Sequence, residues 1–244
     1  MIRLRKAVAL AALITFGALI VTSNPAPHPQ GGVLSRATWP LLLPLAATIV
    51  GLLREAPWSR WLALAAAIAV LPWAVALALT PDYLVPIARP ATALAAALAL
   101  LASLPGKAMF ERYEGRSRGL DWSGRRMTLV RWTVICNSAS VLALYLFVAA
   151  FDFQIEWYAL ILAVTLCGLI LGVLLLAYQR TVGLLVVALC CLCFPPAGLY
   201  FVWQEAIDVG EAILFLVIFA PGLLTGWASL LVFARPMWRY LRSG

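Results

Sequence analysis

Long apolar runs recur from one end of this chain to the other, and they restrict its fold more than any other feature. Of the 244 residues, 64% are hydrophobic and only 11% are charged, and the mean hydropathy is +0.98. A water-soluble domain of this size needs more charge to cover its surface. We therefore expect an integral membrane protein.

The length and spacing of the runs predict how often the chain crosses the membrane. A helix needs about 20 apolar residues to cross about 30 Å of hydrocarbon. We expect an all-α, polytopic bundle with about eight spanning helices, forming a single transmembrane domain over residues 1–244. The expected spans are 7–23, 38–53, 61–80, 88–104, 128–151, 156–178, 182–203 and 211–234. The second and fourth are short, and Pro40 and Pro44 lie in the opening turns of the second.

The basic residues predict the orientation of these spans. If the N-terminus is cytoplasmic, all 18 lysines and arginines except Arg36 and Arg89 fall on the inner side. Such an excess of basic residues in cytoplasmic loops is typical of inner-membrane proteins. We therefore expect both termini to be cytoplasmic. The Ala- and Arg-rich composition further suggests a bacterial inner membrane.

The first apolar run also resembles a signal peptide, because residues 1–6 are basic and residues 7–21 are apolar. The segment Ser23-Asn24-Pro25-Ala26 lacks a clear small-x-small cleavage site. We expect an uncleaved first helix.

The net charge of +8 suggests nucleic acid as a partner only if the chain is soluble. Here the basic residues flank apolar runs, which is the pattern of membrane topology. We expect membrane lipids and other protein subunits as partners, and no nucleic acid.

The inner loop 105–127 is the most distinctive polar segment. Met109, Phe110 and Tyr113 have the spacing of the apolar side of a short interfacial helix. Its basic residues are candidates for contact with anionic lipid headgroups or with a cytoplasmic partner, such as an ATPase that drives a permease. These residues are Lys107, Arg112, Arg116, Arg118, Arg125 and Arg126.

Polar side chains in the middle of the fifth span are candidates for contact with a cargo. Asn137, Ser138 and Ser140 lie where lipid offers no hydrogen-bond partner, so we expect them to face the bundle. Their alternative role is to join neighbouring helices. Possible neighbours in a cargo path are Trp73, Tyr145 and Trp227, with Pro195 and Pro196, which should kink the seventh span.

Two glycine pairs have the small-x-x-x-small spacing that allows close helix contact, Gly168 with Gly172 and Gly222 with Gly226. Both fit packing within the chain or against a partner subunit. The five cysteines all lie in apolar runs, and Cys190, Cys191 and Cys193 form a cluster in the seventh span. A soft-metal site is conceivable there, but we favour packing, because no companion ligand appears and His28 is the only histidine. We expect no metal and no cofactor.

The sequence holds no recognisable catalytic pattern. No ionisable residue lies near the middle of an expected span, which argues against an ion-coupled carrier. The outer loops are acidic, and their acids offer a cation or a basic partner a surface. They are Asp152, Glu156, Glu205, Asp208 and Glu211.

Three functions remain open. The first is a non-catalytic membrane subunit of a larger assembly, such as the permease part of a transport complex. The second is a self-contained transporter or flippase for an uncharged or lipidic cargo. The third is an interfacial enzyme that acts on a lipid-linked substrate.

Overall fold

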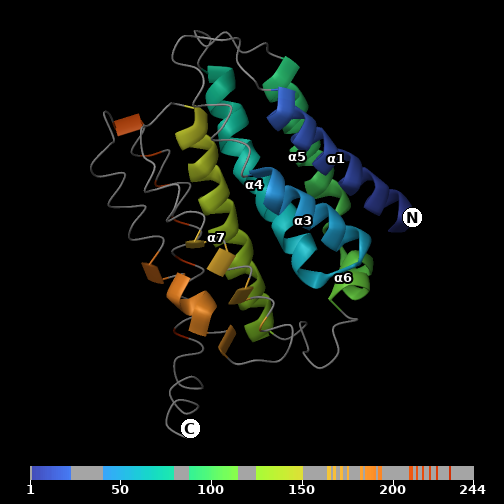
Figure 1. Cartoon of the computed structure of the whole chain (residues 1–244), viewed down its shortest axis with the longest axis vertical. Coiled ribbons are helices and arrows are strands. Elements are labelled where there is room, and N and C mark those ends of the chain that lie inside the picture. The colour runs from blue at the N-terminus through green and yellow to red at the C-terminus, as the bar shows by residue number, and fades with distance from the viewer. Residues whose placement is uncertain are drawn as a thin grey trace, which may run out of the picture. The chain divides into compact units, whose positions relative to one another are not determined.

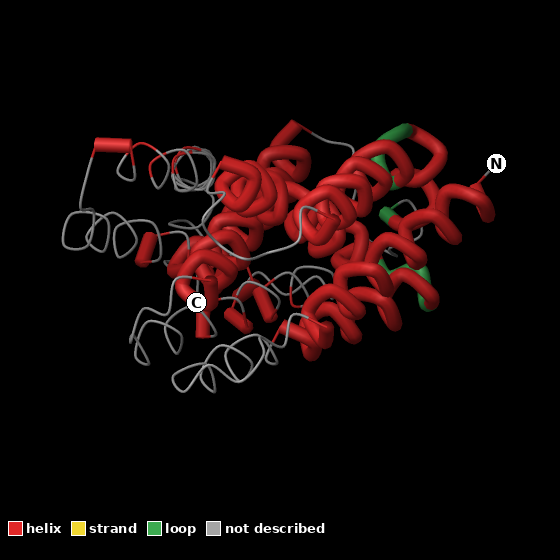
Figure 2. Tube along the Cα trace, turned by 90° about the horizontal axis from the view of Figure 1, so that it is seen from above, coloured by secondary structure: helices red, strands yellow, loops and turns green. Residues whose placement is uncertain are grey.

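The structure is a computed structural model in which every described regular element is a helix (Figures 1 and 2). The long helices are α1 (Ile2–Thr22), α3 (Leu42–Leu53), α4 (Pro57–Leu79), α5 (Ala88–Ser103) and α7 (Arg125–Ala150), and α6 (Lys107–Tyr113) is short. The described residues are 2–22, 41–79, 88–114, 125–150, 164–165, 167–168, 171–172, 175, 182–183, 185–190, 192–193, 209–210, 213, 216, 220, 224 and 231. The all-α class predicted from the sequence is therefore confirmed.

The chain forms two compact units, which are described separately. The first contains residues 1–116 and 142–156, and the second contains residues 117–141 and 157–244. Helix α7 contributes to both, because the division falls after Val141. The expectation of one domain over residues 1–244 stays a prediction.

In the first unit, α1 and α5 lie side by side and run in opposite directions (Figure 1). At one end, Arg5 Nη1 donates to the carbonyl oxygen of Pro105 at 3.2 Å. At the other end, Arg89 Nη2 donates to the carbonyl oxygen of Thr22 at 3.1 Å. The second contact satisfies a carbonyl that the C-terminus of α1 leaves without an intrahelical partner.

Helices α3 and α4 form an antiparallel pair whose connection lies at the same end as the start of α1. Lys6 Nζ donates to the carbonyl oxygen of Leu53 at 3.0 Å, which joins α1 to the end of α3. Arg60 Nε donates to the carbonyl oxygen of Leu104 at 3.0 Å, which joins the first turn of α4 to the segment after α5. The start of α1, the end of α3, the start of α4 and the end of α5 therefore meet at one end of the unit, which we call the basic end.

The chain changes direction sharply after α5, because α6 is bent by 83° from the helix before it. Gly106 makes this bend possible with a φ of 118°, which a residue with a side chain rarely adopts. A Cβ atom at this position would also lie 3.1 Å from Arg5 Nη1. Helix α6 has the apolar side predicted for it, since Met109 and Tyr113 are completely buried.

Within the described residues, α1 is the one helix that is long and apolar enough by itself to cross a membrane, judged by length and composition alone. The bent pair Arg89–Ser103 and Lys107–Tyr113 raises this number to two if it counts as one span. Helix α3 has 12 residues and is about 18 Å long at 1.5 Å per residue, which is less than the thickness of the hydrocarbon layer.

The described helices overlap the expected spans but differ at their ends. Helix α1 begins at Ile2 instead of residue 7, so Arg3, Arg5 and Lys6 belong to the helix. The long side chains of Arg5 and Lys6 reach the carbonyl oxygens of Pro105 and Leu53. Helix α3 begins at Leu42, with Pro44 in its first turn, where a missing N–H group costs little. Helix α4 continues through Pro72.

Candidate functional site

The most elaborate polar arrangement among the described residues lies at the basic end, where α6 meets α1, α3 and α4. We call it the ionic cluster. Its members are Lys6, Glu55, Arg60, Trp61, Arg112, Tyr113 and Glu114.

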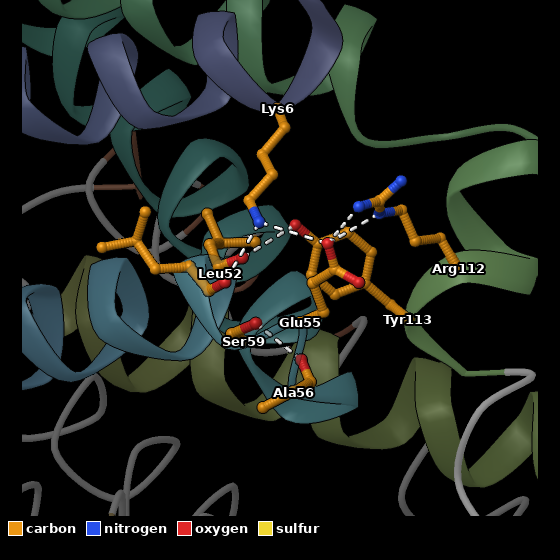
Figure 3. Close-up of polar contacts among 8 residues, drawn as sticks. Lys6, Leu52, Glu55, Ala56, Ser59, Arg112 and Tyr113 are labelled. Carbon is orange, nitrogen blue, oxygen red and sulfur yellow. Dashed lines mark hydrogen bonds and ion pairs between the residues drawn. The ribbon is translucent and has the colours of Figure 1, made fainter. Parts of the chain in front are cut away.

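Glu55 is the first centre of the ionic cluster and occupies the turn between α3 and α4. Its φ of 59° is unusual for a residue with a side chain and costs on the order of 1 kcal/mol. The turn is held by a hydrogen bond from Ala56 N to the carbonyl oxygen of Gly51 at 2.9 Å. This conformation directs the Glu55 carboxylate toward α1 and α6 (Figure 3).

Two cations converge on that carboxylate from opposite sides (Figure 3). Arg112 donates to Glu55 Oε1 through Nε at 2.8 Å and also through Nη2. Lys6 Nζ donates to the same oxygen at 3.3 Å. The hydrogen bond from Arg112, together with the charge of Lys6, lowers the pKa of Glu55 below its ordinary value of 4.5, although partial burial acts in the opposite direction. Glu55 therefore stays ionised at neutral pH.

Glu114 is the second centre and is more deeply enclosed than Glu55. Its side chain has no exposed surface, and it forms an ion pair with Arg60, whose side chain is 8% exposed. The indole Nε1 of Trp61 donates to Glu114 Oε1 at 3.0 Å. The guanidinium carbon of Arg60 lies 6.0 Å from the centre of the Phe110 ring, within the range of a cation–π contact. Burial of an ion pair is tolerated when further hydrogen bonds satisfy the charges, as they do here.

Tyr113 connects α6 to the end of α3. Its hydroxyl donates to the carbonyl oxygen of Leu52 at 3.1 Å, and Lys6 Nζ donates to the carbonyl oxygen of Leu53. Both carbonyls belong to the last turn of α3, where helical carbonyls lack intrahelical partners. Burial, and secondarily the nearby charge of Glu55, raises the pKa of Tyr113 to about 12, so the hydroxyl keeps its proton at neutral pH.

These contacts attach α6 to the neighbouring helices. Both carboxylates are held by cations, and Tyr113 remains a proton donor. Across the part of the chain that the structure describes, no group of three or more His, Cys, Asp or Glu side chains is arranged to hold a metal ion. What the arrangement does is fix α6 to helix ends that are far apart in the sequence.

The basic residues predicted to contact lipid or a partner fall into two groups. The Lys107 side chain is 90% exposed and lies 3.9 Å from Glu111, its neighbour one turn along α6. Arg112 is 31% exposed and belongs to the ionic cluster. Arg125 and Arg126 lie in α7, but the description does not include their side chains, and Arg116 and Arg118 lie outside the described residues.

The polar residues predicted for a cargo path are described only in α7. Asn137 and Ser138 are completely buried, and Ser140 is 3% exposed. Asn137 Nδ2 donates to the carbonyl oxygen of Thr133 and Ser140 Oγ to that of Cys136, each at 2.9 Å, so both use carbonyls of their own helix. Trp73 lies in α4 and Tyr145 in α7, with side chains outside the description. Outside the described residues lie Trp227, Pro195, Pro196, Asp152, Glu156, Glu205, Asp208 and Glu211.

The glycine pair at 168 and 172 packs closely against a neighbouring segment of the second unit. A Cβ atom on Gly172 would lie 2.7 Å from Val187 Cγ2 and 3.1 Å from both the carbonyl oxygen of Gly183 and the backbone nitrogen of Val187. A Cβ atom on Gly168 would lie 2.6 Å from Cys190 Sγ. The close approach suggested by the small-x-x-x-small spacing therefore occurs within this chain, and Cys190 takes part in packing.

Sequence reasoning missed Glu55, Arg60, Trp61 and Glu114 as members of one site. A signal was available, because Glu55 and Glu114 are acids in expected inner segments that also carry basic residues, so pairing with a nearby cation is a natural explanation. The comparisons with known proteins add nothing to this arrangement: no protein-family model, no curated protein and no solved structure matches the chain.

Proposed function

We propose that this chain is a multi-pass protein of a bacterial inner membrane, with about eight spanning helices and both termini in the cytoplasm. Its proposed role is that of a non-catalytic subunit in a larger membrane assembly, as the permease part of a transport complex. The observation that carries this proposal is the fastening of α6 by the ionic cluster.

The orientation is supported by where the basic residues gather. The segments around Lys6, Glu55 and Lys107, which the sequence predicts to be inner, lie at the same end of the first unit. Arg89, one of the two exceptions, lies at the opposite end beside Thr22. Alternate crossing of the membrane requires this arrangement, and the excess of basic charge makes that end cytoplasmic.

The number of spans is supported by helix length. Helix α1 has 21 residues, α4 has 23 and α7 has 26, which corresponds to about 32, 35 and 39 Å at 1.5 Å per residue. Each is sufficient to cross about 30 Å of hydrocarbon. Large apolar side chains are also exposed along α1, including Leu4 at 69%, Ile14 at 60% and Val21 at 57%, as lipid contact requires.

The role as a subunit is supported by the two-sided character of α6. One side packs against the neighbouring helices through Met109 and Tyr113, and Glu114, directly after α6, is buried with them. All three residues are at most 1% exposed. The other side presents the Lys107 and Glu111 side chains, which are 90% and 62% exposed. A partner that binds this exposed side can displace the ends of α1, α3, α4 and α5 together, because the ionic cluster and its neighbouring contacts join them.

Purification from the native host in mild detergent tests this role. We expect a stoichiometric partner protein to remain with the wild-type chain. The double variant Lys107→Glu with Glu111→Lys should lose that partner, because it reverses the charge order on the exposed side of α6 without touching the ionic cluster. A wild-type chain that purifies alone and catalyses transport by itself would contradict the proposal.

A cysteine-labelling experiment tests the orientation separately. In a cysteine-free background, Lys107→Cys should react with a membrane-impermeant reagent only after the cells are opened. Ala88→Cys, at the start of α5, provides the matched position at the opposite end of the first unit. Labelling of position 107 in intact cells would overturn the topology.

The polar residues of α7 favour a second function, a self-contained transporter for an uncharged or lipidic cargo. Four polar side chains are buried there within two turns, namely Thr133, Asn137, Ser138 and Ser140. Ser138 Oγ makes no hydrogen bond within the described part of the chain. Uptake into liposomes that contain only this chain, lost in Ser138→Val while the folded yield is kept, would support this second function.

A further inference from the structure

We propose that the basic end carries a binding site for anionic phospholipid headgroups, formed by the exposed cations that remain when the ionic cluster has used the carboxylates of Glu55 and Glu114. This inference rests on the membrane location in the proposed function, and it does not depend on any partner subunit.

The first step is a count of charges at the basic end, over residues 2–22, 41–79 and 88–114. The cations there are Arg3, Arg5, Lys6, Arg54, Arg60, Lys107 and Arg112, and the carboxylates are Glu55, Glu111 and Glu114. The ionic cluster takes two of these carboxylates, Glu55 and Glu114, and holds them with Lys6, Arg112 and Arg60. The carboxylate of Glu111 is then the one acid left to balance the other four cations, which are Arg3, Arg5, Arg54 and Lys107.

The second step is the exposure of these remaining cations. Arg3 and Arg54 are exposed and form no ion pair with any carboxylate in the described ranges around them. The Lys107 side chain is 90% exposed, and its contact with Glu111 at 3.9 Å is open to solvent. Exposed pairs of this kind contribute little, so Lys107 is available to an anion.

The third step is the position of large apolar side chains directly beside these cations. Leu4 lies between Arg3 and Arg5 and is 69% exposed, and Leu53 precedes Arg54 and is 55% exposed. Exposure of both leucine side chains to water is unfavourable. At a membrane interface, each leucine can lie in hydrocarbon while the adjacent arginine lies among lipid phosphates. An acidic protein surface would satisfy the arginines but not this repeated apolar neighbour. The exposed leucines therefore favour phospholipid over protein as the occupant beside Arg3 and Arg54.

The headgroup chemistry follows from the charges. Guanidinium and ammonium groups bind phosphate, and a headgroup with net negative charge is attracted more strongly than a zwitterionic one. Phosphatidylglycerol is a suitable probe of the first kind and phosphatidylcholine of the second.

The test is a lipid titration of the full-length chain purified in detergent, with the retained lipids counted by native mass spectrometry. Wild type is expected to retain phosphatidylglycerol in preference to phosphatidylcholine. The variant Arg54→Gln with Lys107→Gln is expected to bind phosphatidylglycerol about 30-fold more weakly, because each basic residue contributes about fivefold.

Two control variants keep the result interpretable. Arg36→Gln with Arg89→Gln removes the same charge from the predicted outer side and should retain wild-type binding. Arg54→Lys with Lys107→Arg keeps the charge and should also retain it, which separates lost binding from lost folding.

Three outcomes would overturn the proposal. They are equal retention of the two lipids by wild type, unchanged retention in the Arg54→Gln, Lys107→Gln variant, and an equal loss in the outer-side control. Because the chain is tested alone, the result is independent of whether a partner subunit exists.

Discussion

Arg60 and Glu114 lie 54 positions apart in the sequence, yet they form an ion pair in which the glutamate side chain has no exposed surface. One residue belongs to the first turn of α4, and the other directly follows α6. The pair therefore links the residue that follows α6 to the first turn of α4.

Glu114→Gln should destabilise the chain by about 3–5 kcal/mol, because it removes the carboxylate that compensates the buried charge of Arg60. The measurement is thermal or denaturant unfolding of the full chain in detergent. Glu111→Gln is the matched control, since the Glu111 side chain is 62% exposed, and its effect should stay within about 0.5 kcal/mol. Replacing both partners, with Arg60→Met and Glu114→Leu, should recover most of the loss. A Glu114→Gln chain as stable as the Glu111→Gln control would contradict a stabilising pair.

Glu55 should make the stability depend on pH in the acidic range. Its pKa in the folded state lies below the ordinary value of 4.5, so the folded chain binds this proton less readily than the unfolded chain does. The stabilisation is therefore fully present above about pH 4.5 and is lost as the pH falls through the lowered pKa. Melting temperatures of wild type should decline more steeply there than those of Glu55→Gln, while Glu111→Gln keeps the wild-type slope. Identical slopes in all three chains would refute this role.

Tyr113 should make the stability depend on pH in the alkaline range. Its pKa rises from 10.0 to about 12 on folding, so the folded chain holds this proton more tightly than the unfolded chain does. The stabilisation is fully present below pH 10 and is lost as the pH rises to about 12. Ultraviolet titration should show Tyr113 ionising late, and Tyr113→Phe should remove one tyrosine from the late step. A late step of unchanged size in Tyr113→Phe would assign it to other tyrosines.

Gly172→Ala should cost about 1–3 kcal/mol, because the added methyl group meets backbone atoms of Gly183 and Val187 that cannot move aside alone. Gly168→Ala should cost less, since the Cys190 side chain is the one contact that its methyl group meets among the described residues. Adding Cys190→Ala should relieve Gly168→Ala but not Gly172→Ala. Unfolding of the purified chain measures all of these, and an equal cost for the two glycines would contradict the described packing.

The helical class could be predicted from the sequence because apolar runs and flanking charges are local properties. The apolar side of α6 was also predictable, since Met109 and Tyr113 are four positions apart and face the same way. The early start of α1 was harder to predict, because the charges of Arg3 and Lys6 suggest a loop although their long side chains let the helix continue.

The partners in the ionic cluster could not be predicted from spacing. Lys6 and Arg112 reach Glu55 from 49 and 57 positions away, and only the antiparallel packing of the helices brings them together. The lone histidine and the cysteine cluster are rare residue types and stand out in the sequence, whereas Glu55 and Glu114 resemble ordinary loop charges. Burial, which distinguishes these two acids from Glu111, is a property of the folded chain.

The contact between α4 and the segment after α5 also has a consequence for biosynthesis. A ribosome makes Arg60 long before Glu114, and domains generally acquire their structure as units while the chain is being made. The first turn of α4 receives this carboxylate only after residue 114 has left the ribosome and the insertion machinery. A nascent chain arrested before residue 114 has emerged should therefore be more sensitive to protease near residue 60 than a chain arrested after residue 114 has emerged.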